Sequence, residues 1–515
     1  MSRRISGGRR KVASAVAVVM TVAAGAAGAV AVPAGAVGVE AGTARKVPVV
    51  DFNGDGHADM AVGSPNGTAS GKAAAGYVSV VYGAAGGVDQ AKHYLFGQDS
   101  PGIPGASETG DRFGSTVVPV DLDGDGYTDL VVGASGEDVG SGASGVDAGM
   151  VTVLWGGPSG LRDATAVDTG ATARAGVGGF LQAGDFDGDG RPELVTSHGD
   201  QSLWTLSGIG RDGKVASVSD LDLWKVASGI TVILHSIAAG DVNGDGISDL
   251  VALVTDTDES DAYRGYILLG GANGFTSAGY ARQAGGERLP GQSVAIGDVN
   301  GDGYGDIVFG HSTDFYDSDE DLPVKGGAVA VAYGGPGGQS STLAPQWINQ
   351  DTAGVPGVSE TGDRMGASVA VGDVNGDGYA DIVAGIPGED YDGLTDAGSF
   401  VLLRGTAKGV TGAGSQVFSQ NSAGVPGVSE SGDRFGAVTG VIPAESSDPA
   451  QVVIGDPDEN GGNGAVWVLH GTGTGLTGTG TVNFGSVTMG TSGVGAYFGD
   501  ELSTTPRDLD LDQSA

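Results

Sequence analysis

The chain has no cysteine, few basic residues and few aromatic residues. Without cysteine it can form no disulfide bond, no thiolate metal site and no thiol nucleophile. Lys and Arg number only 25, against 63 Asp and Glu, and the formal net charge is −38. Because nucleic acids and anionic membrane surfaces need basic patches, this charge argues against both as partners. Aromatic residues make up only 6% of the chain, which predicts a core built mostly of Val, Leu, Ile and Ala.

Glycine, by contrast, is abundant, with 100 copies in 515 residues. It follows no three-residue period, and this excludes a collagen-like triple helix. The length suits several domains or one large repeat domain, so the internal repeats decide between these two possibilities.

Residues 1–36 have the charge and hydropathy order of a secretory signal peptide. Basic residues precede an uncharged segment rich in Ala, Val and Gly at 12–39, and A-x-A patterns follow at 29–31 and 34–36. We expect cleavage after Ala36, which lowers the formal charge from −38 to −43 by removing five basic residues. The alternative is an uncleaved anchor, since the segment is long enough to cross a bilayer, but Ala and Gly anchor weakly.

Export leads us to expect a secreted, extracellular protein with a linker at 37–46 and no membrane span once the signal is removed. The pair Arg3–Arg4 leaves the general secretory and twin-arginine routes both open.

A nine-residue pattern, D-x-[DN]-G-D-G-x-x-[DE], occurs six times and defines loops one to six, at 51–59, 121–129, 185–193, 241–249, 298–306 and 373–381. Short apolar stretches flank each loop. A third stretch with period-2 alternation follows in seven copies, at 77–82, 150–155, 202–206, 266–269, 328–333, 400–403 and 465–469. A weaker fourth stretch comes next, as at 93–96, 346–349 and 416–419. Four short strands in each of seven units, without an amphipathic helical window, predict an all-β, seven-bladed β-propeller over 47–505.

The last unit leaves the blade number open between seven and eight. Its loop is replaced by Pro443-Ala-Glu-Ser-Ser-Asp-Pro, and the pattern then restarts at Phe498-Gly499 before an acidic tail at 506–515. The tail either pairs with the first unit and closes the ring or begins an eighth blade. Seven copies of the third stretch favour closure.

The nine-residue loops combine side-chain oxygens at positions 1, 3, 5 and 9 with a backbone carbonyl at position 7, and such a donor set suits calcium. Glycine at positions 4 and 6 permits the positive φ that wraps the chain around an ion. Without a cation the clustered carboxylates repel one another. A solvated Asx-turn hairpin without metal is the alternative, but six copies in register favour up to six Ca²⁺ ions. Magnesium is disfavoured because it prefers a strict octahedron with retained waters.

The expected calcium ligands are thirty residues, five per loop. They are Asp51, Asn53, Asp55, His57 and Asp59; Asp121, Asp123, Asp125, Tyr127 and Asp129; Asp185, Asp187, Asp189, Arg191 and Glu193; Asp241, Asn243, Asp245, Ile247 and Asp249; Asp298, Asn300, Asp302, Tyr304 and Asp306; and Asp373, Asn375, Asp377, Tyr379 and Asp381. Loop three departs most, with Pro192 and the longer Glu193. We expect each ion to stabilise the folded blade, because a ligand bound only by the folded state raises its stability.

With these motifs the chain resembles the FG-GAP repeat family, known from the N-terminal propeller of integrin α subunits and from secreted bacterial proteins. The "FG" element matches Phe113-Gly114, Met365-Gly366, Phe435-Gly436 and Phe498-Gly499, and the "GAP" element matches 63–65, 133–135, 385–387 and 455–457. Units three to five lack a clean copy of either. The resemblance implies a seven-bladed propeller with calcium loops on its lower face, and it names no ligand.

In this family the remaining loops lie on the upper side. Three near-identical segments there, at 105–112, 357–364 and 427–434, each carry Glu, Asp and Arg at fixed spacing. We interpret them as internal clamps in which Arg bridges carboxylates of adjacent blades, and alternatively as ligand-contacting loops. Other upper loops are acidic and serve either as a solubilising rim or as a face for a cationic partner, or for an anionic glycan through bridging calcium. The candidate ligand-binding residues are Glu137, Asp138, Asp317, Glu389 and Asp390.

No H-E-x-x-H or G-x-S-x-G motif occurs, so we predict no catalytic residue. The sequence favours a secreted, monomeric, calcium-binding module for adhesion or recognition of an extracellular protein or glycan. The alternative is a lectin-like propeller or a calcium-dependent polysaccharide lyase or hydrolase. Exposed Trp and Tyr around one face favour the carbohydrate alternative, whereas an acidic face poor in aromatics favours protein recognition. We expect Trp155, Trp204 and Trp467 to lie in the core.

Overall fold

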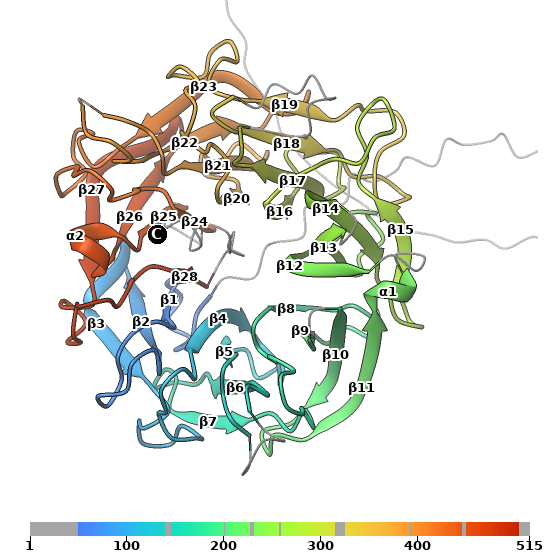
Figure 1. Cartoon of the computed structure of the whole chain (residues 1–515), viewed down its shortest axis with the longest axis vertical. Coiled ribbons are helices and arrows are strands. Elements are labelled where there is room, and N and C mark those ends of the chain that lie inside the picture. Colours follow the sequence, from blue (N-terminus) through green and yellow to red (C-terminus); the bar gives the residue numbers. More distant parts are fainter. Residues whose placement is uncertain are drawn as a thin grey trace, which may run out of the picture. The chain divides into compact units, whose positions relative to one another are not determined.

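The computed structural model describes residues 50–139, 146–199, 201–226, 231–256, 259–314, 325–391, 393–444 and 450–503. The predicted signal peptide, the linker, Asp317 and the tail at 506–515 lie outside the described residues. The rest forms seven four-stranded antiparallel sheets placed as blades around a ring (Figure 1). The predicted fold is therefore confirmed.

The first four blades follow one another along the chain. Blade 1 contains β1 (Met60–Ser64), β2 (Tyr77–Ala84) and β3 (Gly87–Phe96), and blade 2 contains β4 (Phe113–Val120), β5 (Asp129–Ala134), β6 (Met150–Trp155) and β7 (Asp163–Ala166). Blade 3 contains β8 (Leu181–Gly184), β9 (Glu193–Ser197), β10 (Ser202–Ile209) and β11 (Val215–Asp222). Blade 4 contains β12 (Val232–Gly240), β13 (Asp249–Asp256), β14 (Glu259–Leu269) and β15 (Thr276–Tyr280).

Three further blades complete the ring. Blade 5 contains β16 (Ser293–Gly297), β17 (Asp306–His311), β18 (Ala328–Ala332) and β19 (Gln346–Ile348), and blade 6 contains β20 (Val369–Gly372), β21 (Asp381–Ile386), β22 (Ser399–Arg404) and β23 (Thr411–Phe418). Blade 7 contains β24 (Val438–Ile442), β25 (Gln451–Asp456), β26 (Ala465–Thr472) and β27 (Gly475–Gly485). All seven copies of the alternating third stretch form strands, as the sequence predicts, although the strand of the fifth copy ends at Ala332, one residue early.

The C-terminal segment closes the ring. Strand β28 (Glu501–Leu502) is the inner strand of blade 1 and pairs antiparallel with β1, with Val62 opposite Leu502 and Gly63 opposite Glu501. Blade 1 is thus built from both ends of the described chain, and the choice between seven and eight blades is settled as seven.

The core consists of seven apolar clusters, one between each pair of neighbouring blades, among the described residues. Val, Leu, Ile and Ala dominate them, as the sparse aromatic content predicts. A blade on its own would leave these faces exposed, so closing the ring is what buries them. The "FG" side chains Phe113, Met365, Phe435 and Phe498 are fully buried at four of these junctions.

Glycines of the "FG" and "GAP" elements meet where neighbouring blades come closest. A Cβ on Gly63 of blade 1 would lie 2.2 Å from the carbonyl oxygen of Gly114, which opens blade 2 with φ near +91°. In the same way, a Cβ on Gly385 of blade 6 would lie 1.9 Å from the carbonyl oxygen of Gly436, which opens blade 7. The glycines of the two motifs therefore allow neighbouring blades to pack in direct backbone contact.

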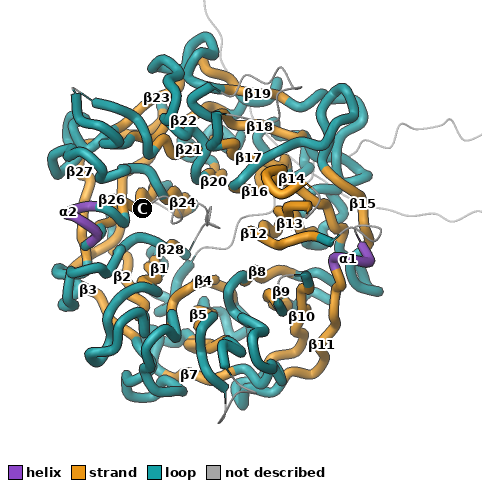
Figure 2. The backbone as a smooth tube through the Cα atoms, viewed as in Figure 1, coloured by secondary structure: helices purple, strands orange, loops and turns teal. Residues whose placement is uncertain are grey.

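Helix is almost absent from the described chain, as Figure 2 shows. It is limited to α1 (Leu223–Val226) and α2 (Glu459–Gly462), of four residues each. Among the described residues, no helix is long and apolar enough to cross a membrane.

Candidate metal loops and the upper acidic rim

The first Asp of each nine-residue loop organises the loop backbone. Its carboxylate accepts the N–H of the glycine at position 4 at 2.6–2.8 Å and that of the glycine at position 6 at 2.8–3.0 Å, in all six copies. Both glycines have positive φ, for example +71° at Gly54 and +83° at Gly56. The loops therefore share one backbone conformation, including loop three with its divergent sequence.

Positions 3 and 5 provide the outer oxygens. The position-5 carboxylate accepts the N–H of position 7 at 2.8–3.1 Å in every loop, and its side chain is exposed. At position 3 of loop six, Asn375 is only 8% exposed and its Oδ1 has no hydrogen-bond partner. A buried amide oxygen without a partner is costly, and a bound cation would satisfy it.

The position-9 carboxylate is buried in all six loops and is built into its own blade. In loop one, Asp59 accepts the N–H of Phe52 at 2.8 Å and that of Gly83 at 2.7 Å. Burial, together with repulsion from the carboxylates at positions 1 and 5, raises the pKa of Asp59 to about 7. The same main cause raises the pKa of Asp129, Glu193 and Asp306 to about 7 and that of Asp249 and Asp381 to about 6.

Loops two and three bring three carboxylates to one point. Oxygens of Asp121, Asp123 and Asp129 lie within 4.8 Å of one another, and so do those of Asp185, Asp187 and Glu193. The longer side chain of Glu193 thus reaches the position that Asp fills elsewhere. The other four loops carry Asn at position 3, which offers an amide oxygen instead of a carboxylate. The oxygen donors and the negative charge of these residues fit calcium. At position 7 the donor would be the backbone carbonyl and not the side chain; the residues there are His57, Tyr127, Arg191, Ile247, Tyr304 and Tyr379.

The loops are also joined to one another around the lower face. The N–H of position 8 donates to the position-1 carbonyl of the preceding loop, as from Thr128 to Asp51 at 2.9 Å and from Gly305 to Asp241 at 2.8 Å. Equivalent bonds join loops three and four and loops five and six. In addition, the aromatic or aliphatic side chain at position 7 covers the position-4 glycine of the preceding loop, as Tyr127 covers Gly54. Loops one, three, four and five are therefore each bonded to the loop of the next blade.

The junction between loops two and three differs. Pro192 stands at position 8 of loop three and has no N–H to donate. Instead Arg211, from the hairpin between β10 and β11, reaches back to loop two, where its Nη2 lies 2.8 Å from Asp125 and its Nε bonds to Asp123. A guanidinium therefore lies against two carboxylates of this candidate metal loop. In loop six, Arg404 lies 3.6 Å from Asp377 and 3.5 Å from Asp381.

The upper rim contains three clusters built to one pattern, at the junctions of blades 1 and 2, 5 and 6, and 6 and 7. In each, a buried Gln from the end of one blade donates to a Glu of the next: Gln98 to Glu137, Gln350 to Glu389 at 2.6 Å, and Gln420 to Glu459 at 2.7 Å. An Asp in the segment that opens the next blade accepts a backbone N–H within that segment, as Asp363 does from Glu360 at 2.6 Å.

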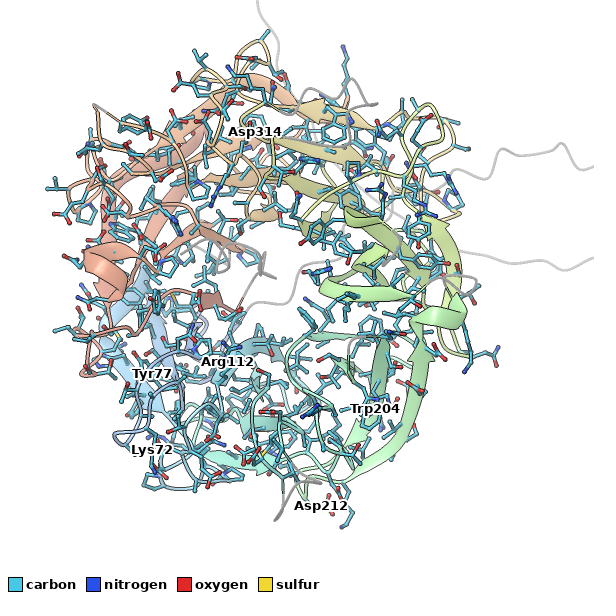
Figure 3. All side chains as sticks on the ribbon, viewed as in Figure 1. Lys72, Tyr77, Arg112, Trp204, Asp212 and Asp314 are labelled. Carbon is cyan, nitrogen blue, oxygen red and sulfur yellow. The ribbon has the colours of Figure 1, made fainter. Side chains whose placement is uncertain are left out.

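The prediction that Arg residues of the three near-identical segments clamp adjacent blades is therefore wrong. The side chains that join neighbouring blades here are Gln98, Gln350 and Gln420, which lie outside those segments. Arg434 pairs with Asp458 at 3.3 Å within blade 7, while Arg112 and Arg364 form no ion pair with a described residue. Figure 3 shows Arg112 on the inner side of the ring beside β4, where it helps to line a cavity of about 390 Å³ with Asp500 and Glu501. These Gln residues were not predicted as contact residues from the sequence. The pattern Q-[DN]-[ST]-x-G-[IV]-P-G, which begins with each of them and occurs three times, could have identified them.

The candidate ligand-binding residues of the rim are engaged in local hydrogen bonds. Glu137 and Glu389 are half-buried and bonded to Gln98 and Gln350, while Asp138 accepts the N–H of Asp147 and Asp390 that of Asp396, both at 2.9 Å. Burial raises the pKa of Glu137 to about 7. Asp314 (Figure 3) likewise accepts two backbone N–H groups, from Gly326 and Gly362.

The described tryptophans form no exposed belt. Trp155 and Trp467 are buried in the core, as predicted. Trp204 (Figure 3) is only half-buried and stacks on His198 with ring centroids 3.7 Å apart, and Trp347 is half-buried against the cluster between blades 4 and 5.

Comparison with protein families identifies the repeats. A family model described as FG-GAP repeat matches residues 43–81, 113–154 and 365–403, and one described as FG-GAP-like repeat matches residues 241–309. Where the structure describes them, these ranges lie in blades 1, 2, 4, 5 and 6. The chain thus carries FG-GAP repeats, as its motifs predict.

Curated relatives match through part of their length. Integrin alpha-8 from Mus musculus is 29% identical over 208 residues, covering 40% of this chain and 18% of the integrin. Phosphatidylinositol-glycan-specific phospholipase D from Mus musculus is 35% identical over 149 residues, covering 28% of this chain and 17% of the phospholipase. This chain is homologous to the N-terminal propeller region of integrin alpha subunits, and it spans less than a fifth of the length of these relatives. Among solved structures, an exotype rhamnogalacturonan lyase matches 84% of this chain and 75% of its own, with 15% identity and a TM-score of 0.34.

Proposed function

We propose that this FG-GAP propeller is an exported recognition or adhesion module whose ring is stabilised by calcium in the six lower loops. The observation that carries the calcium proposal is the buried carboxylate at position 9, flanked in every loop by further carboxylates. Such groups are stable as anions only with a compensating positive charge, and a calcium ion supplies it.

The stabilising role follows from how the loops are joined. The residue at position 2 packs into the cluster shared with the next blade, as Phe52 does between blades 1 and 2 and Val299 between blades 5 and 6. An ion that fixes a loop therefore also fixes the contact between two blades. Calcium binds the folded loops and not the unfolded chain, so it raises the free energy of unfolding.

Recognition rather than catalysis is supported by the state of the upper acidic residues. The candidate carboxylates there already accept hydrogen bonds from Gln side chains or backbone N–H groups. Among the described residues, the exposed large apolar side chains include only two aromatics, Tyr94 and Tyr497. A glycan site usually presents aromatic faces, so these features favour a protein partner with a cationic surface over a carbohydrate.

Export is supported by the signal-like segment at 1–36. Sequencing of the mature N-terminus from culture medium tests it, with Val37 expected as the first residue.

The partner proposal is tested by binding screens of the mature, calcium-loaded chain against arrayed extracellular proteins and arrayed glycans. The same screens run in chelator provide the control. Calcium-dependent, salt-sensitive capture of a basic protein supports the proposal, whereas binding confined to glycans contradicts its preference for protein.

A further inference from the structure

Blade 7 differs from the other blades at both ends. Its lower loop has lost the nine-residue pattern, yet at its upper end oxygens of Asp433, Asp456 and Glu459 lie within 4.8 Å of one another. This cluster lies at the junction with blade 6, on the side of the ring opposite the six loops.

Asp456 is the unusual member of the cluster. It occupies the middle position of the "GAP" element, where blades 2 and 6 have Ala134 and Ile386. Its side chain is 0% exposed; one carboxylate oxygen accepts the N–H of Glu459 at 2.9 Å, and the other, Oδ2, has no hydrogen-bond partner. A carboxylate buried in this way is strongly disfavoured unless a positive charge or a proton accompanies it.

The surroundings add oxygen donors. Asp433 is 3% exposed, and Gln420, at 1% exposed, donates its Nε2 to Glu459 at 2.7 Å while its Oε1 has no partner. The guanidinium of Arg434 pairs at 3.3 Å with Asp458, which is not one of the three carboxylates. The cluster is therefore rich in hard oxygen atoms.

The clusters of blades 2 and 6 are an internal comparison. They contain the same Gln, Glu and Asp but have an apolar residue in place of Asp456. The two-carboxylate clusters act as clamps, and the third, fully buried carboxylate is what distinguishes blade 7.

We propose that Asp433, Asp456 and Glu459 form an additional divalent-cation site of the calcium type on the upper side of blade 7. Three carboxylates with a nearby amide oxygen match the ligands that calcium prefers. The competing explanation is that Asp456 keeps a proton and donates it to a neighbouring carboxylate. Burial, followed by repulsion from Glu459 and Asp433, holds the pKa of Asp456 well above its usual range, so either a proton or a cation could meet the demand.

Crystals of the mature chain soaked in manganese, with anomalous diffraction, test the proposal directly. We expect a peak among the three carboxylates in the parent protein and none in Asp456→Ala, with the lower-loop peaks unchanged in both. Peaks in the lower loops but none in blade 7 overturn this inference alone. A peak in blade 7 with none in the loops contradicts the proposed role of the loops and leaves this inference standing.

Equilibrium dialysis with calcium and thermal melting provide a measurement that does not need crystals. We expect Asp456→Ala to bind one calcium ion fewer per chain and to show a smaller calcium-dependent rise in melting temperature. The control Asp163→Ala, which removes an exposed carboxylate from strand β7 of blade 2, should bind the parental number. If Asp456→Ala keeps the full number of ions and melts higher by the same amount in calcium and in chelator, Asp456 holds a proton and the proposal is wrong.

Discussion

The lower loops and the upper rim use the same residue types to different ends. Both are built from Asp, Glu and an amide side chain, and in both a buried carboxyl has a raised pKa, as in Asp59 below and Glu137 above. Below, the buried carboxylate is surrounded by others with exposed oxygens, whereas above, the half-buried Glu137 accepts a hydrogen bond from Gln98 of the preceding blade. Acidity alone therefore does not identify a candidate cation site; the number of carboxylate oxygens that converge on one point does.

The largest expected effect separates a loop acid from a rim acid. Asp298→Ala in loop five removes the acceptor of three backbone N–H groups and one calcium ligand. We expect a loss of about 2 kcal/mol in chelator and about 5 kcal/mol at calcium a hundredfold above its Kd. Denaturant unfolding measures both, with exposed Asp390→Ala, expected to cost under about 1 kcal/mol, as the control. Equal losses in the two variants, with no dependence on calcium, would remove the distinction between the faces.

A pair of glycine substitutions compares loop one, which the next loop contacts, with loop two, which lacks this contact. Gly54 and Gly124 share position 4 and a φ near +71° and +74°, but a Cβ on Gly54 would lie 2.5 Å from Tyr127 Cε1, whereas one on Gly124 meets nothing within 4 Å. We expect Gly124→Ala to cost about 1 kcal/mol for its backbone alone and Gly54→Ala about 1–2 kcal/mol more, because the ring must move. Identical unfolding free energies would show that the loops do not support one another.

The pH dependence of stability tests the rim clamp. Glu137 has its folded pKa raised from about 4.5 to about 7, so its contribution is lost as pH rises through this window, and the charged form costs stability at pH 8. Glu137→Gln should therefore raise the free energy of unfolding by about 1 kcal/mol at pH 8, allowing for solvent screening, and leave it unchanged near pH 4. The exposed Glu108→Gln in the same cluster is the control. A Gln variant that is less stable at pH 8 would mean that the charge itself holds the clamp.

The smallest effect concerns loop two, where Arg211 pairs with the carboxylates at positions 3 and 5. Removing Arg211 frees Asp123 and Asp125, so Arg211→Ala should raise the calcium affinity of loop two about threefold, in keeping with a partly exposed ion pair. Calorimetric titration measures this, and Arg162→Ala, an exposed arginine that bonds to Tyr94, should leave all affinities unchanged. A weaker site in Arg211→Ala would indicate that the arginine orders loop two instead of competing for it.

Much of the fold could be predicted because the sequence consists of repeats, each of which forms one blade. The six loops and seven alternating stretches favour seven blades over eight, and Phe498-Gly499 marks the segment that the structure shows closing the ring through β28. The links between loops could not be foreseen, since they depend on which residue of one repeat faces the next, although Pro192 already signals a missing donor. The reach of Arg211 depends on the placement of a hairpin in another blade.

The cluster in blade 7 shows a different limit of sequence reasoning. Asp456 stands next to Pro457 in a loop rich in acidic residues, and nothing in that composition distinguishes a buried carboxylate from a solvated one. Asp456 stands out only when the "GAP" elements are aligned, which shows a carboxylate where other blades have an apolar residue, and when the structure shows that this position is buried. Trp204, expected in the core, is half-exposed for a related reason: strand periodicity does not report how well a neighbouring blade covers it.

The most direct test of the central claim is a calorimetric calcium titration of the chelated mature chain, with thermal melting followed in parallel. The account predicts binding of about six ions through the lower loops, one more if the blade 7 site is filled, with a large rise in melting temperature. Binding of one ion or none, with no shift in melting temperature, would contradict calcium as the ion that holds the ring together.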